Sequence, residues 1–87
     1  MGNLAVKIEI VERDRWSGPK TDDWMVCQTV EDAYKFEKEY NARNTEPTAP
    51  EWYMQVEGKP IPIDLSDTQF DKLKSDGRVL LSILKNI

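Results

Sequence analysis

The chain has 87 residues, with 12 Lys and Arg against 16 Asp and Glu, so its net charge is −4. It has no His and a single Cys, Cys27, which excludes a Ser–His–Asp triad, His-bound zinc, a thiolate metal cluster and an intramolecular disulfide. We therefore expect one small domain over residues 1–87, with neither a cofactor nor a metal.

The N-terminal part predicts two antiparallel strands. Apolar side chains alternate with others along residues 4–10, which is typical of a half-buried strand, and we place this strand from Leu4 to about Arg13. A polar segment with a Gly-Pro turn signal, residues 14–23, predicts a long hairpin loop, and residues 24–28 predict the second strand. Cys27 falls inside this strand, and we expect a buried, inert thiol because the chain offers it no His base.

The next segment predicts a helix from Thr29 to about Ala42. Thr29 is a good N-cap, and Asp32, three residues on, can complete a capping box. Apolar residues recur at helical spacing and predict the buried side: Ala33, Phe36 and Tyr40. The two prolines in residues 45–50 cannot continue the helix.

The C-terminal part predicts a third strand and a second helix. Residues 52–56 have strand character, and the prolines in residues 59–63 favour an extended edge segment after them. Ser66 and Gln69 match a capping box, so the helix should begin at Asp67. Apolar spacing favours one long helix, weakened at Gly77, or two helices that meet there; a strand over residues 78–84 is the competing interpretation.

The predicted order is therefore ββαβα, which indicates a small α+β domain. We expect a three-stranded sheet with both helices packed on one face, so that both apolar sides are buried. If the second and third strands share that sheet, the helix between them makes them parallel.

The acidic residues suggest several interpretations. The middle third, residues 30–57, has seven acidic and three basic residues and carries the whole negative excess. A solvated helix face is the interpretation we favour. Imitation of DNA phosphates is the alternative, and it would use Glu31, Asp32, Glu37, Glu39 and Glu46. We considered Mg²⁺ at Asp64, Asp67 and Asp71, and favour ordinary cap and dipole roles for these carboxylates.

The segment after the first strand is the most informative surface. Arg13, Arg15, Trp16 and Lys20 place three cations and an indole within eight residues. Arg and Trp dominate binding interfaces more often than other residues, so we predict a partner-binding surface here; the alternative is that Trp16 folds back over the core. Trp52 and Tyr53 are adjacent in a strand and point to opposite faces, so one of them would mark a second contact surface.

Residues 30–45, VEDAYKFEKEYNARNT, and residues 50–54, PEWYM, form a pattern together with Trp16-Ser17-Gly18. Over residues 6–56 the chain resembles small proteins of unassigned function encoded by tailed bacteriophages. Asp32 stands where those proteins often have Glu, and the segment after Gly58 lies outside the resemblance. The resemblance implies a phage origin and brings no known chemistry.

We therefore predict a non-enzymatic phage protein for host takeover or anti-defence, which binds a host protein in the host cytoplasm and inhibits or redirects it. We find neither a secretory signal nor an apolar run near the roughly 20 residues of a membrane helix. The first alternative is a small nucleic-acid-binding regulator that uses the Arg13–Trp16 loop, although the net acidity disfavours it. The second is an acidic DNA mimic. A homodimer through the C-terminal helix is a further hypothesis, because the apolar spacing there resembles heptads.

Overall fold

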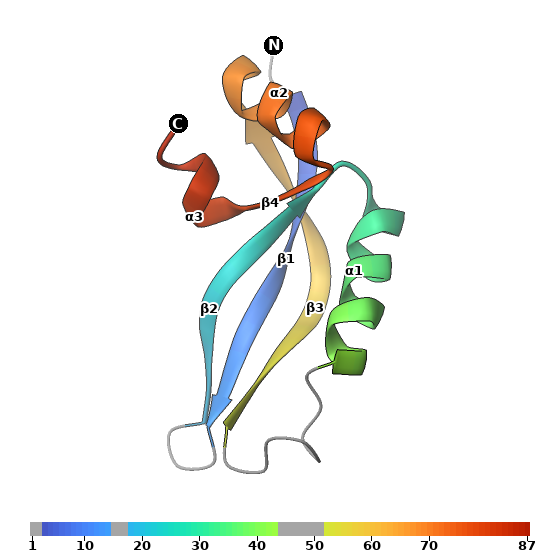
Figure 1. Ribbon diagram of the computed structural model, residues 1–87, viewed down its shortest axis with the longest axis vertical. Coiled ribbons are helices and arrows are strands. Elements are labelled where there is room, and N and C mark those ends of the chain that lie inside the picture. The colour runs from blue at the N-terminus through green and yellow to red at the C-terminus, as the bar shows by residue number, and fades with distance from the viewer. Residues whose placement is uncertain (1–2, 15–17, 44–51) are drawn as a thin grey trace.

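The computed structural model describes residues 3–14, 18–43 and 52–87 (Figure 1). The elements follow one another in the order β1 (Asn3–Asp14), β2 (Gly18–Cys27), α1 (Val30–Arg43), β3 (Trp52–Leu65), α2 (Asp67–Asp76), β4 (Arg78–Leu80) and α3 (Leu81–Leu84). The α+β class is confirmed, whereas the predicted ββαβα order is wrong because it lacks β4 and α3. No helix in the described ranges is long and apolar enough to cross a membrane.

The sheet has four antiparallel strands in the order β3-β1-β2-β4. The prediction of three strands is wrong, because Arg78–Leu80 pairs with the end of β2 as a fourth. β1 lies at the centre and pairs over almost its whole length with both β2 and β3. β2 and β3 therefore run parallel to each other, as predicted, but β1 separates them.

Helices cover both faces of the sheet, so the prediction of helices on one face is wrong. One cluster packs α1 against the sheet: Ile8, Ile10, Cys27, Ala33, Phe36 and Val56. The other packs α2 and α3 against the opposite face: Ala5, Val26, Leu65, Leu73, Val79, Leu81 and Leu84. The physical reason is visible in β2, where the neighbours Val26 and Cys27 point to opposite faces and are both fully buried.

The C-terminal segment divides at Gly77. The Ser66–Gln69 capping box is confirmed, with the Gln69 N–H donating to Ser66 Oγ and the Ser66 N–H donating to Gln69 Oε1. α2 ends where Gly77 takes a φ of 84°, a conformation that favours glycine. The chain then forms β4 and α3, so each of the two competing interpretations of residues 78–84 is right over part of the segment. The single long helix proposed for a homodimer does not form, and Leu73, Leu81 and Leu84 are buried within the chain.

α1 begins as predicted, but the Asp32 side chain in its first turn has a different partner from the predicted one. The Asp32 N–H donates to Thr29 Oγ1 at 3.1 Å, which confirms Thr29 as the N-cap. The Asp32 carboxylate accepts hydrogen bonds from Arg78 instead of completing the capping box. Ala33 and Phe36 are buried and Tyr40 is half-buried, so the predicted apolar side is confirmed.

β2 and β3 are both longer than predicted. β2 begins at Gly18, where φ is 77°, so strand replaces most of the predicted loop over residues 14–23. β3 continues past Gly58, and its register shifts between the pairs Lys7–Ile61 and Glu9–Glu57. A positive φ at Gly58 accommodates this irregularity. The prolines beyond it are tolerated because β3 is an edge strand, as predicted.

Candidate functional site

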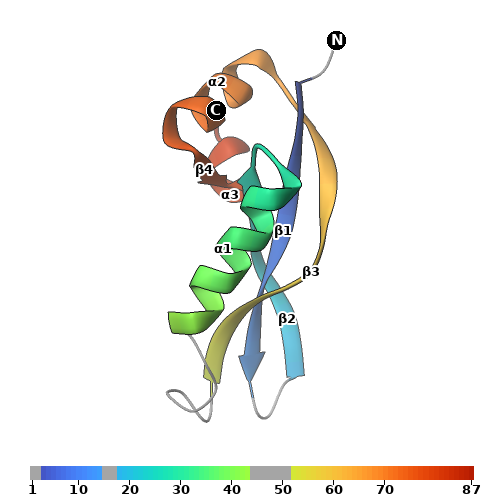
Figure 2. The same cartoon turned by 90° about the vertical axis from the view of Figure 1, so that its right-hand side faces the viewer.

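The candidate site lies on the sheet face opposite α1, in the half nearer the β1–β2 hairpin. Alternate residues of β1 point to this side, because the residues between them, Ile8 and Ile10, face α1. Figures 1 and 2 show α2 and α3 gathered toward the end of the sheet where β1 begins, and the hairpin extending away from them. We call the following set the open face: Lys7, Glu9, Val11 and Arg13 of β1 with their neighbours Thr21, Trp24, Gln55 and Glu57. All of these side chains except Val11 are half-buried or exposed.

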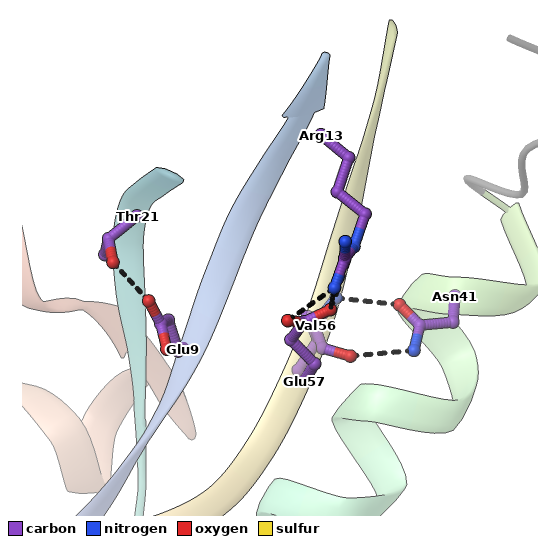
Figure 3. Close-up of polar contacts among 6 residues, drawn as sticks. All are labelled: Glu9, Arg13, Thr21, Asn41, Val56 and Glu57. Atoms are coloured by element: carbon purple, nitrogen blue, oxygen red, sulfur yellow. Dashed lines mark hydrogen bonds and ion pairs between the residues drawn. The ribbon is translucent and has the colours of Figure 1, made fainter. Parts of the chain in front are cut away.

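Arg13 and Glu57 form the main ion pair of the open face (Figure 3). Nη2 of Arg13 donates to both carboxylate oxygens of Glu57, at 2.7 and 2.6 Å, and Nε donates to Oε2 at 3.1 Å. Both side chains are 34% exposed. A pair so open to water contributes little stability, about 0.2–1 kcal/mol, but its geometry fixes the plane of the guanidinium above the sheet.

Two further contacts fix side chains of the open face beside this ion pair. The Thr21 hydroxyl donates to the Glu9 carboxylate across the β1–β2 pairing (Figure 3). The Lys7 ammonium lies 4.4 Å from the centre of the Trp24 ring, at cation–π distance. Trp24 also packs against the cluster below α2 and α3, so its ring is anchored while part of it stays accessible.

An open hollow of about 240 Å³ lies beside the Thr21–Glu9 contact. Its lining consists of Glu9, Val11, Pro19, Lys20, Thr21 and Glu57. Glu9 and Glu57 are direct cross-strand neighbours, a like-charge arrangement that by itself destabilises a sheet. Arg13 offsets this repulsion by neutralising Glu57. The open face therefore presents charges of both signs, largely matched within the face.

The structure locates only part of the predicted binding surface. Arg13 lies on the open face, and Lys20 is exposed at its hollow. Arg15 and Trp16 lie outside the described residues, as do the side chains of Trp52 and Tyr53. The backbone of Tyr53 pairs with that of Arg13, so the two contact surfaces predicted separately adjoin at one end of the sheet.

Sequence reasoning missed most of the remaining open face. Lys7 and Glu9 could have been found, because the period of two in the first strand places them on the side of Arg13. Glu57, Thr21 and Trp24 join them only through the registers of β2 and β3. Those registers contain a bulge and a shift, for which the sequence offered no reliable signal.

Side chains bond to backbone groups on the outer strand β3 and on β2 just beyond the part that β4 pairs with. The Asn41 amide brackets Val56 of β3: Nδ2 donates to the Val56 carbonyl at 2.9 Å, and the Val56 N–H donates to Oδ1 at 2.8 Å (Figure 3). On β2, the Trp24 N–H donates to Asp23 Oδ1 at 2.7 Å, and the Ser82 hydroxyl donates to Oδ2 at 2.7 Å. Such capping protects an edge strand from adding another chain. Side chains of the open face, rather than these capped positions, are therefore available to a partner.

A second arginine cluster lies on the α1 side of the sheet. Arg78 of β4 donates to both carboxylate oxygens of Asp32, at 3.0 and 2.8 Å, and to Glu39 at 3.2 Å. Its guanidinium lies 5.4 Å from the centre of the Phe36 ring. The hydrogen bonds from Arg78 hold the pKa of Asp32 below its ordinary value. This cluster ties β4 to α1.

Cys27 is fully buried beside the same cluster, as predicted. Loss of hydration, with a smaller contribution from the neighbouring Asp32, raises the pKa of its thiol to about 12. A thiol in this state is not a nucleophile near neutral pH. Within the described ranges, no three His, Cys, Asp or Glu side chains gather as a metal site would require.

Comparison with protein-family models, with curated proteins and with solved structures gave no match to this chain. The resemblance to phage proteins therefore stays a prediction. The functional argument rests on the geometry of the open face.

Proposed function

We propose that this chain is a non-enzymatic phage protein that binds a host protein in the host cytoplasm and inhibits or redirects it. The open face and the adjoining hairpin form the contact surface. The observation that carries this proposal is the mixed-charge open face, with Arg13 held by Glu57 and Lys7 placed over Trp24. The phage resemblance is what makes the partner a host protein.

The composition of the open face favours a protein partner. Arg and Trp contribute most of the binding energy in many protein interfaces, and both are present here. Binding costs less when a side chain is already ordered, because less conformational entropy is lost on contact. Glu57 orders Arg13 in this way, and the packing of Trp24 against the neighbouring cluster orders its ring.

Nucleic acid fits the open face less well. A nucleic-acid surface has to neutralise phosphates with Lys and Arg. Here Glu57 already neutralises Arg13, and Glu9 adds a second carboxylate that repels phosphate. We therefore keep the nucleic-acid regulator, which would use the Arg13–Trp16 loop, as an outcome of the test rather than as a second proposal.

Imitation of DNA also gains little support. Two of the five carboxylates predicted to imitate phosphates, Asp32 and Glu39, form ion pairs with Arg78. Glu46 lies outside the described residues. A mimic needs unneutralised carboxylates along one surface. The ion pairs with Arg78 neutralise two of the carboxylates on α1.

The test is capture of partners from a host lysate, with nuclease present and absent, followed by mass spectrometry. The tagged wild-type chain should retain one stoichiometric host protein after nuclease treatment. The double variant Arg13→Ala, Lys20→Ala should capture at least tenfold less of this host protein. The matched control is Lys38→Ala, Arg43→Ala, which removes the same two charges from exposed positions on α1 and should bind as the wild type does.

Both variants should keep the circular dichroism spectrum and thermal midpoint of the wild type within a few degrees, because surface substitutions of this kind have small effects. Equal capture by the two variants would refute the assignment of the open face. Recovery of nucleic acid alone, lost after nuclease, would support the regulator instead.

A further inference from the structure

We draw no further inference here: the strongest candidate, the pair of exposed apolar side chains Val30 and Tyr34 one turn apart on α1, is an unpartnered apolar surface, and nothing in the structure shows what covers it.

Discussion

Arg13 and Arg78 make the same contact in two different settings. Each uses its guanidinium to donate to both oxygens of one carboxylate, across elements distant in sequence. Arg78 also contacts Glu39 and the Phe36 ring, and it joins β4 to α1 beside the buried Cys27. Arg13 lies on the half of its sheet face that α2 and α3 leave uncovered, and its partner Glu57 lines the open hollow.

The difference lies in what surrounds each pair. Arg78 connects two elements that pack together: its backbone belongs to β4 of the sheet, and its carboxylate partners belong to α1. The strands that the Arg13–Glu57 pair joins, β1 and β3, are already paired through their backbones. We therefore propose that Arg78 serves stability and that Arg13 serves recognition.

The largest expected effect concerns the thiol beside Arg78. A rise in pKa from 9.0 to about 12 lowers the thiolate fraction of Cys27 about 1000-fold, and burial also blocks access. Alkylation of the native chain near pH 8 should therefore be at least about 1000-fold slower than alkylation of the unfolded chain. Mass spectrometry of the time course measures both rates.

The same alkylation experiment distinguishes the roles of Arg78 and Arg13. Arg78→Ala should accelerate alkylation of Cys27, because α1 and β4 lose their connection above the thiol. Arg13→Ala should leave the rate unchanged. Rapid labelling of the native wild-type chain would show that this part of the core opens easily, and would contradict the role given to Arg78.

The next effect is on stability. Arg78→Ala should lower the free energy of unfolding by about 1–2 kcal/mol, because it removes charge-assisted hydrogen bonds from a half-buried site and leaves Asp32 and Glu39 uncompensated. Urea denaturation measures this change. Lys72→Ala, which breaks an exposed pair with Asp76 on α2, is the control and should cost less than about 0.5 kcal/mol. Equal effects of the two substitutions would remove the distinction.

A smaller effect appears on acidification. Hydrogen bonds from Arg78 hold the pKa of Asp32 below its ordinary value of 3.8, so the unfolded chain takes up this proton more readily than the folded chain. The resulting stabilisation is complete above that value and is lost as the pH falls through the folded pKa. The stabilities of the wild type and Asp32→Asn should therefore differ at pH 6, and the difference should shrink as the pH falls below 3.8. A constant difference across urea titrations in this range would contradict the pairing.

Local signals predicted the helix boundaries well. The N-caps Thr29 and Ser66 depend on residues within one turn, which the sequence displays directly, and Gly77 is displayed as a weak point where the helix can end. The central strand was also predicted within a residue at each end, because its alternation is continuous.

Features set by distant partners could not be predicted in the same way. β4 has three residues, and it becomes a strand because Val79 meets Val26 across the sheet. Glu57 joins Arg13 across 44 residues of sequence, and only the shifted register of β3 brings them together. The covering of both sheet faces could not be predicted, because Ala5 falls on the same side of the alternating strand as Lys7 and Glu9, yet α2 and α3 bury it.

The central claim is that Arg13 serves recognition while Arg78 holds the fold. The most direct test measures Arg13→Ala twice, in urea denaturation and in capture of the host protein. We predict an unfolding free energy within about 0.5–1 kcal/mol of the wild type, together with at least a tenfold loss of capture. Undiminished capture, or destabilisation as large as that of Arg78→Ala, would contradict the account.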